Sequence, residues 1–292
     1  MSDFVQQQNS ICEFATSDSW VILSPIEQSI KKKIEAVGTP LKDWDINIYR
    51  GVLTGCNEAF IIDSKKRDEI LANCQTEDER KRTAELIRPI LRGRDIKRYG
   101  YADNGLYLIN THNGIRGRIP RINIEDYPAV KAHLDQYWDR IATRADKGDT
   151  PYNLRNCAYF EDFFKPKIIF QEIVQNSQFL YDDTIHYMCN DTGRIIVGQH
   201  LPFILGVLNS KLFFYAVKKF YGGGILGEHG IRMKHTFFGN FPCLSYNEQI
   251  EEVAKELSKE YRNDLIDYAD QLVYSAYSLS KEEISEINGE VI

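Results

Sequence analysis

The sequence lacks the features that place a chain in several common classes. None of its six cysteines stands in a C-x-x-C pair, and its six histidines show no H-x-x-x-H or Cys/His spacing. We therefore expect no metal site and interpret the cysteines as reduced residues of a packed core. No apolar run approaches the roughly 20 residues that a membrane helix needs. Residues 1–14 lack the basic-then-apolar order of a secretory signal, so the sequence predicts a cytoplasmic protein with no membrane partner.

Catalytic motifs are missing as well. None of the nine prolines adjoins another, so the chain does not contain the Asn-Pro-Pro-aromatic motif with which amino-methyltransferases grip an extruded base. We expect no catalytic residue and no bound cofactor in this chain. One arrangement keeps an alternative open, because Asp45, Asp63 and Lys65 would suit an autonomous magnesium-dependent nuclease. In the simpler interpretation, Asp63 ends a strand.

Positive charge is scarce overall but concentrated locally. The formal net charge is −6. Residues 247–292 hold twelve acidic and four basic residues, a balance of −8, which leaves +2 for residues 1–246. Residues 88–121 hold eight basic and two acidic residues, a balance of +6. Such a patch can contact several phosphates of a nucleic acid, and each contact adds a salt-dependent contribution to the affinity.

Capping residues and hydrophobic periodicity predict a mixed α/β (α+β) fold. Ser24-Pro25-Ile26-Glu27 and Thr76-Glu77-Asp78-Glu79 are capping boxes, which predict helices ending at about Val37 and Leu86. Alternating apolar segments bounded by turn residues predict strands. The expected strands are 105–111, 166–173, 179–188 and 194–197, and the further expected helices are 126–144, 201–220, 248–277 and a short last helix capped by Ser280.

The composition divides the chain into three expected parts. Residues 1–18 are expected to form a flexible polar tail, residues 19–246 the main body, and residues 247–292 an acidic helical segment. Phosphate repels an acidic surface, so we expect these helices to pack against the body or against a catalytic partner, and not against nucleic acid.

Residues 46–61, INIYRGVLTGCNEAFI, are the most informative stretch of the chain. A strand-like segment runs into the polar turn Thr54–Asn57 and then into a second apolar run, which predicts a hairpin with a polar tip. Gly55 lies in this turn and allows backbone conformations that are closed to other residues.

This stretch and five later ones resemble, in order, the TaqI-like C-terminal specificity domain of Type II restriction-modification methyltransferases. The later stretches are LIRPILRGRDIKRYGY (86–101), YPAVKAHLDQYWDRIATRADKGDTPYNLR (127–155), FFKPKIIFQEI (163–173), FILGVLNSKLFFYAV (203–217) and IDYADQLVYSAYSLSKEEISEI (266–287). The resemblance extends over about residues 20–290. Tyr152 departs from the family pattern, which often has tryptophan at that position.

The resemblance implies a target-recognition-domain-like sheet with flanking helices and a C-terminal helical segment. It also implies that the chain recognises a short sequence of duplex DNA and presents the target base to a methyltransferase domain. In the resembling family, methyl transfer and cleavage reside in separate domains of the same or an adjacent chain. S-adenosylmethionine and magnesium are therefore expected in those partner domains. A protein-interaction module without a DNA role remains a further alternative.

The turn 112–118, HNGIRGR, holds the best candidates for contact with bases. Arg116 and Arg118 flank Gly117, and the guanidinium fork matches guanine O6 and N7, or a phosphate. A solvated surface turn is the alternative interpretation. Gln171 and Gln175 are candidates for contact with adenine. The other candidates for DNA contact are Arg92, Arg94, Lys97, Arg98, Asn113, Arg144, Lys147, Arg155, Lys165 and Lys167, with a structural ion-pair role as the alternative for the 92–98 group.

Overall fold

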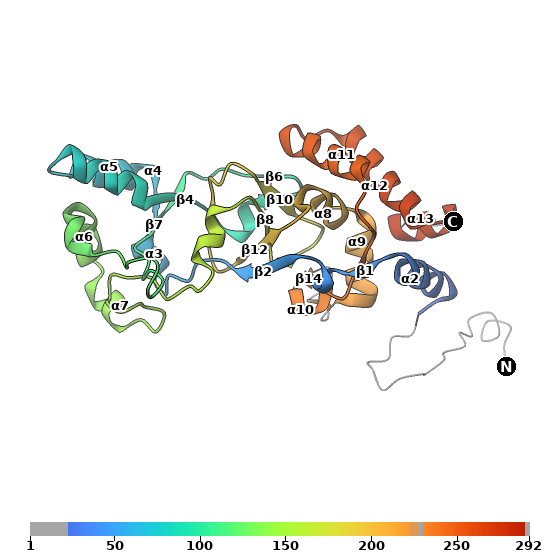
Figure 1. The fold of residues 1–292 in the computed structure, drawn as a ribbon, viewed down its shortest axis with the longest axis horizontal. Helices are drawn as coiled ribbons and strands as arrows, with labels where there is room; N and C mark the ends of the chain where they lie inside the picture. The colour runs from blue at the N-terminus through green and yellow to red at the C-terminus, as the bar shows by residue number, and fades with distance from the viewer. Residues whose placement is uncertain (1–22, 223–224, 227–229, 290–292) are drawn as a thin grey trace. The chain divides into compact units, whose positions relative to one another are not determined.

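The computed structural model describes residues 23–222, 225–226 and 230–289. The chain forms two compact units, each built from separate stretches of sequence (Figure 1). The first unit takes its described residues from Met1–Asp45, Ile173–Ser177 and Pro202–Ile292, and the second consists of Ile46–Glu172 and Gln178–Leu201. The predicted tail, 1–18, lies outside the described residues. The predicted boundary between residues 246 and 247 falls inside the first unit and stays a prediction.

The second unit contains an antiparallel sheet with the strand order β10-β8-β12-β2. Its strands are β2 (Ile46–Arg50), β8 (Lys167–Gln171), β10 (Phe179–Asp182) and β12 (Gly193–Gly198). Ile195 of β12 lies opposite Ile169 of β8 and is fully buried, as expected for a central strand. Because β12 and β2 run antiparallel, Arg194 at the start of β12 lies opposite Arg50 at the end of β2.

A second sheet in this unit has the order β11-β4-β7-β3. Its strands are β3 (Ile61–Asp63), β4 (Ile87–Leu91), β7 (Leu106–Ile109) and β11 (Met188–Cys189). β11 and β4 run parallel, and the other neighbours run antiparallel. β7 lies within the predicted strand 105–111 and leads into the turn that carries Arg116 and Arg118. Leu108 and Ile109 are fully buried, so the start of this turn is anchored in the core.

Short helices and a strand pair complete the second unit. α4 and α5 lie beside each other in Figure 1. The helices are α3 (Asn57–Phe60), α4 (Ser64–Ala72), α5 (Glu77–Leu86), α6 (Pro128–Asp135) and α7 (Trp138–Thr143), with 3₁₀ turns η2 (Gly93–Asp95), η3 (Ile124–Asp126) and η4 (Phe160–Phe164). β5 (Ile96–Lys97) pairs with β6 (Gly100–Tyr101). The unit thus combines helices and sheets, as the expected mixed α/β class requires.

The first unit is mainly helical. Its helices are α2 (Pro25–Val37), α8 (Leu201–Leu208), α9 (Lys211–Ala216), the π-helix η5 (Val217–Tyr221), α10 (His235–Phe238), α11 (Glu248–Lys259), α12 (Asn263–Ala276) and α13 (Lys281–Asn288), with the 3₁₀ turn η1 (Leu41–Asp43). β1 (Thr39–Pro40) pairs with β15 (Pro242–Cys243), and β13 (Ile225–Leu226), β14 (Gly230–Arg232) and β9 (Ile173–Val174) form a small sheet. No single described helix is both long and apolar enough to cross a bilayer, and α8 with α9 and η5 meets that test only as a pair bent by 63°.

The predicted helix starts are confirmed. Ser24 Oγ accepts a hydrogen bond from Glu27 N–H at 3.3 Å, and the Glu27 carboxylate accepts one from Ser24 N–H at 2.7 Å. This capping box satisfies amide groups that the first turn of α2 leaves without partners. Ser280 caps α13 in the same way. Thr76 caps α5 with half of the predicted box, because its side chain accepts from Glu79 N–H while the Glu79 carboxylate accepts from Gln75 N–H.

The predicted hairpin around Gly55 is wrong. β2 pairs with β12 and β3 pairs with β7, so the strands on either side of the turn belong to different sheets. The helical turn α3 separates them. The local features of the turn are confirmed, because Gly55 has a φ of +65° and Thr54 Oγ1 accepts a hydrogen bond from Cys56 N–H at 3.3 Å.

Three predicted helices are each divided into two. The expected helices 126–144, 201–220 and 248–277 correspond to α6 and α7, to α8 and α9 with η5, and to α11 and α12. At the break after α8, Ser210 Oγ donates to Val207 O at 2.7 Å and accepts from Phe213 N–H at 3.1 Å. Its side chain thus ends one helix and caps the next. The apolar periodicity continues across the break, which is why the sequence predicted a single helix.

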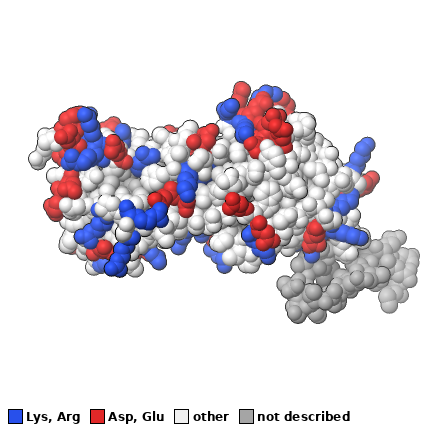
Figure 2. All heavy atoms as spheres, viewed as in Figure 1, with Lys and Arg blue, Asp and Glu red and all other residues white. Residues whose placement is uncertain are grey.

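Four of the twelve acidic residues of the C-terminal segment lie on α11: Glu248, Glu251, Glu252 and Glu256. Figure 2 shows Asp and Glu concentrated over α11. Its apolar face is buried, with Ile250, Ala254 and Leu257 almost fully covered. The charge therefore lies on the solvent side of an amphipathic helix.

Candidate functional site

Two adjoining pockets of the second unit form one concave surface. The first has a volume of about 390 Å³ and the second, which is more open, about 930 Å³. Both are lined by Asn113, Gly114 and Asn156–Ala158, so they are continuous. We call this surface the arginine-rimmed concavity. Its arginines are Arg50 and Arg155 at the first pocket and Arg116, Arg118 and Arg121 at the second.

The turn between Ile115 and Ile119 displays two of these arginines. Ile115 and Ile119 form an antiparallel bridge. Ile115 N–H donates to Ile119 O at 2.8 Å, and Ile119 N–H donates to Ile115 O at 2.9 Å. Gly114 has a φ of +71°, and a Cβ built on it would lie 2.2 Å from Ile119 O. Glycine is therefore required there for the turn to close. The closed turn holds Arg116 and Arg118 at its exposed tip.

Asn113 fixes the base of this turn. Its Oδ1 accepts a hydrogen bond from Asp149 N–H at 2.8 Å, and its Nδ2 donates to Asp149 Oδ1 at 3.1 Å and to Asn156 Oδ1. The side chain thus joins the turn to the 149–156 segment. Asn113 was predicted to contact DNA. Its side-chain polar atoms form hydrogen bonds within the protein instead, and in this way it positions the arginines of the turn.

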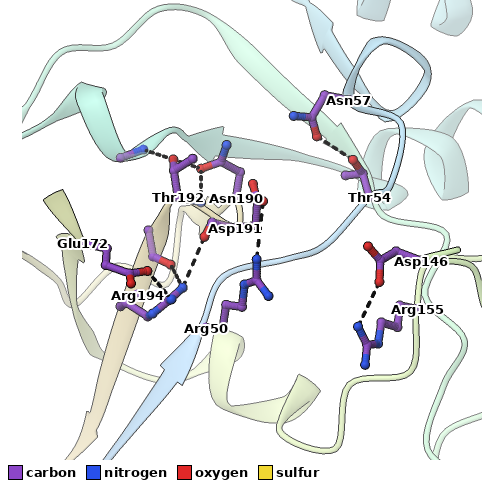
Figure 3. A network of polar contacts seen from close by, with 12 residues as sticks. Arg50, Thr54, Asn57, Asp146, Arg155, Glu172, Asn190, Asp191, Thr192 and Arg194 are labelled. Carbon is purple, nitrogen blue, oxygen red and sulfur yellow. Dashed lines mark hydrogen bonds and ion pairs between the residues drawn. The ribbon is translucent and has the colours of Figure 1, made fainter. Parts of the chain in front are cut away.

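Four of the five arginines have an acidic partner that is exposed or half-buried. Figure 3 shows Arg50 directed toward Asp191 and Arg155 directed toward Asp146, at 3.7 Å and 2.9 Å. The other two pairs are Arg118 with Glu161 and, at 3.3 Å, Arg121 with Asp149. Exposed ion pairs of this kind contribute about 0–1 kcal/mol each. Each guanidinium can therefore leave its carboxylate for another anion at little cost.

Arg116 differs from the other four arginines. It is exposed and has no hydrogen bond or ion pair with any residue that the structure describes. The adjacent Gly117 has a φ of +80°, and nothing lies within 4 Å of a Cβ built on it. The space beside Gly117 is thus open, and Arg116 is free to bind a ligand.

Aromatic rings form a rigid wall of the first pocket. The Tyr159 ring stacks on Tyr49 with centroids 4.3 Å apart, and the Phe160 ring packs on His112 at 4.4 Å. Burial raises the pKa of Tyr159 to about 12 and lowers the pKa of His112 below its usual value. Both groups are therefore neutral near pH 7, and the charge at this pocket comes from its rim.

The 92–98 group of predicted phosphate contacts divides into two kinds. Arg92 makes two hydrogen bonds of 2.9 Å to the buried carboxylate of Asp95. Burial alone would raise the pKa of Asp95, but the hydrogen bonds and charge of Arg92 lower it below the usual value. Arg92 is therefore structural. Arg94 and Lys97 are exposed, and Lys97 Nζ donates to the carbonyl of Arg94 at 3.0 Å.

Three more of the predicted DNA contacts have a partner nearby within the protein: Arg98, Lys147 and Lys165. The Arg98 guanidinium lies 5.9 Å from the centroid of the Tyr99 ring. Lys147 Nζ donates to Ala142 O at 2.6 Å, and Lys165 Nζ lies 2.7 Å from Asp162 Oδ1. Both lysine residues are exposed, so these contacts leave them available to a phosphate.

Two predicted DNA contacts are buried in the second unit. Lys167 is fully buried and its Nζ lies 2.7 Å from Asp182 Oδ2. Arg144 is 7% exposed, donates to Asn153 O at 2.5 Å and lies over the Phe60 ring at 4.2 Å. Burial lowers the pKa of Arg144 to about 10. Both cations are held inside the fold, so we remove them from the proposed contacts.

Two glutamines were predicted to contact adenine. Gln171 ends β8 opposite Gly193 and is half-buried against Gly93, whereas Gln175 is exposed in the first unit. Neither lines the arginine-rimmed concavity. Their predicted role stays a prediction.

The residues of the nuclease alternative have ordinary structural surroundings. Asp63 is the N-cap of α4, and its carboxylate accepts a hydrogen bond from Lys66 N–H at 2.7 Å. Asp45 and Lys65 are exposed. Within the described ranges, no group of three or more His, Cys, Asp or Glu residues is arranged to hold a metal ion. Asp63 thus has the simpler of its two predicted roles, at the end of a strand.

Sequence reasoning missed three residues of the concavity: Arg50, His112 and Arg121. Arg50 stood inside the informative stretch 46–61, directly before Gly51. Gly51 packs against the backbone of Asn190, with a built Cβ only 1.9 Å from its carbonyl oxygen. An arginine next to a glycine at the end of a predicted strand was the available signal.

Comparisons with known proteins concern the family and the fold of the chain. Residues 88–225 match the family model of the TaqI-like C-terminal specificity domain, which confirms the resemblance seen in the sequence. The Type IIL restriction-modification enzyme MmeI, whose structure is in complex with DNA, is similar with a TM-score of 0.61 and 16% identity over 85% of this chain and 35% of that chain. The type IIG restriction endonuclease BpuSI gives a TM-score of 0.56 and 15% identity over 90% of this chain and 31% of that chain. The likeness to these structures is one of fold, and this chain spans about a third of their length.

Proposed function

We propose that this chain, which contains a TaqI-like C-terminal specificity domain over residues 88–225, recognises a short sequence of duplex DNA. The arginine-rimmed concavity carries this proposal, because five arginines line one continuous hollow of the second unit. Arginine binds phosphates bidentately and is the commonest partner of guanine in the major groove.

The two kinds of arginine have different roles in this proposal. Arg116, at the open tip of a rigid turn, contacts a base edge. The four paired arginines exchange a carboxylate for a phosphate when DNA binds. Because each exchange releases counterions from the DNA, the affinity depends steeply on salt concentration. The exposed Arg94, Lys97, Lys147 and Lys165 of the same unit add further phosphate contacts.

The recognised site is then presented to a methyltransferase domain, on the same chain or on an adjacent one. S-adenosylmethionine, and magnesium where cleavage occurs, bind to the partner domains. Three observations support this division of labour. The chain has no adjacent prolines and hence no Asn-Pro-Pro motif, and it matches a specificity domain. The restriction-modification enzymes of similar fold are about three times as long.

A binding selection on randomised duplexes tests the proposal. Purified chain is incubated with a library of duplexes at several salt concentrations, and the bound fraction is sequenced. We expect one short enriched sequence, together with an affinity that falls as salt rises. Quantitative binding of the selected duplex and a scrambled control then gives the specificity ratio. Equal binding to both duplexes at every salt concentration would contradict the proposal.

A further inference from the structure

Backbone hydrogen bonds hold His112 in place at the wall of the first pocket. It follows β7, and its N–H donates to Asn110 O at 2.8 Å. Its carbonyl accepts a hydrogen bond from Ile122 N–H at 3.0 Å. The backbone of His112 is therefore fixed both to Asn110 before the turn and to Ile122 after it, and His112 is one of the residues that line the 390 Å³ pocket.

The imidazole ring has one defined orientation. Its Nδ1 accepts a hydrogen bond from Gly114 N–H at 3.2 Å, and its face packs on the Phe160 ring at 4.4 Å. A neutral imidazole carries one proton, so a ring whose Nδ1 accepts a hydrogen bond has its proton on Nε2. Nε2–H is thus a donor with a fixed direction.

This donor is available to a ligand from outside the described part of the chain. Nε2 makes no hydrogen bond with any residue in the described part of the chain. Nε2 is not one of the buried polar atoms that lack a hydrogen-bond partner. Because it has no partner among the described residues, it must be accessible to solvent. A positioned, neutral and accessible donor in a pocket is suited to a ligand that offers an acceptor.

We infer that His112 is a specificity-determining residue, whose Nε2–H donates to an acceptor on the major-groove edge of one base pair. The acceptors available there are purine N7, guanine O6 and thymine O4. This inference rests on the proposed DNA recognition. It adds an uncharged residue that contacts a base, beside the charged arginines of the concavity. The rim arginines supply attraction to phosphate, whereas an uncharged donor gains little from phosphate and discriminates between base edges.

A matched pair of substitutions separates this role from a structural one. In His112→Asn, Oδ1 takes the place of Nδ1, so the acceptor for Gly114 N–H is kept and the donor is lost. In His112→Gln, the side-chain amide takes the place of Nε2, so the donor is kept and the acceptor for Gly114 is lost. Both variants and wild type are taken through the selection on randomised duplexes, and their thermal unfolding is measured.

We expect His112→Asn to unfold near the wild-type temperature and to lose about 5- to 150-fold discrimination at one base pair. His112→Gln should keep that discrimination. The selected duplex is then rebuilt with analogues that each lack one acceptor: 7-deazapurines for N7, 2-aminopurine for guanine O6 and 5-methyl-2-pyrimidinone for thymine O4. One of these analogues should weaken binding of wild type and of His112→Gln, and should leave binding of His112→Asn unchanged.

Two results would overturn the inference while leaving DNA recognition intact. One is a His112→Asn variant with the full sequence preference of wild type. The other is a uniform loss of affinity for all duplexes, which would indicate a phosphate contact. If wild type itself binds all sequences equally, the proposed function fails, and that outcome is distinguishable from the other two before any variant is made.

Discussion

Arg155 Nη1 lies 2.9 Å from Asp146 Oδ1, although the two side chains are 56% and 33% exposed. The carboxylate thus occupies, at the rim of a concave surface, the position that a DNA phosphate would take beside the guanidinium. An exposed pair of this kind is weak. The acidic partner therefore acts less as a source of stability than as a competitor for the arginine.

We predict that Asp146→Asn strengthens binding to all duplexes by severalfold. The substitution frees Arg155 and removes a negative charge near the phosphates, so the salt dependence of binding should become steeper. The control is Asp139→Asn, which makes the same charge change at an exposed residue that lines neither pocket. Fluorescence anisotropy across a salt series measures both quantities. Equal gains from the two variants would show that the effect is one of net charge alone.

Arg116→Ala and Arg94→Ala should differ in kind. Arg116 has no partner among the described residues and stands at an open tip, so its loss should cost about 1–3 kcal/mol on the selected sequence only. Arg94 is exposed outside the concavity, so its loss should weaken binding to all sequences and reduce the salt slope by about one unit. Both variants are compared with wild type in the binding selection.

The assignment of Arg116 to a base and of Arg94 to a phosphate would be reversed if Arg94→Ala altered the enriched sequence and Arg116→Ala did not. Gly114→Ala serves as a positive control for the turn. The added Cβ would lie 2.2 Å from Ile119 O at a φ of +71°, so it should disturb the turn and reduce the preference without removing any charge.

Local features of the fold could be predicted from the sequence because they depend on neighbouring residues. The capping box at Ser24 and the glycine turn that carries Arg116 and Arg118 are of this kind. The hairpin at Gly55 failed because strand pairing is non-local: β2 pairs with β12, about 140 residues later in the chain. Local residues form the same turn in either arrangement.

The site could be predicted only in part for the same reason. From the sequence alone, Lys167 is expected to be a cation at the edge of a strand. In the structure, β8 pairs with β10, and this pairing places Asp182 opposite Lys167. Burial then fixes both charges inside the fold. His112 becomes a positioned donor only when Phe160 packs on its ring. No local pattern around residue 112 encodes a partner 48 residues away.

Lys167→Met and Lys165→Met should separate stability from binding. Lys167 is fully buried with Asp182, so its removal leaves an unpaired buried carboxylate and should cost about 3–5 kcal/mol of the free energy of unfolding. Lys165 is exposed, so its removal should change the free energy of unfolding by less than about 1 kcal/mol and weaken DNA binding. Urea unfolding and anisotropy are measured on both variants. A binding defect in a stably folded Lys167→Met variant would restore Lys167 to the DNA contacts.

The free energy of unfolding should fall as pH decreases below about 6.5, through the protonation of the half-buried His112 and the buried His133. Burial lowers the pKa of both His112 and His133 below the usual value of the imidazole. The unfolded chain therefore binds more protons than the folded chain between the lowered pKa and about 6.5, and stability rises with pH in that window. Each histidine contributes at most about 1.4 kcal/mol per pH unit. The lowered carboxylate pKa of Asp182 acts only below about pH 4, where Asp titrates, so it does not obscure the effect.

His133→Gln tests this origin of the pH dependence directly. The imidazole Nε2 of His133 lies 3.0 Å from Ala59 O, and the amide of glutamine can donate to the same carbonyl without a proton that titrates. We expect the slope of unfolding free energy against pH, between pH 5 and 6.5, to decrease in His133→Gln and to decrease further when His112→Asn is added. Urea unfolding at half-unit pH intervals gives these slopes. The two side chains make no contact with each other in the described part of the chain, so their effects on the slope should add. A slope that is unchanged in the double variant would place the acid sensitivity elsewhere in the chain.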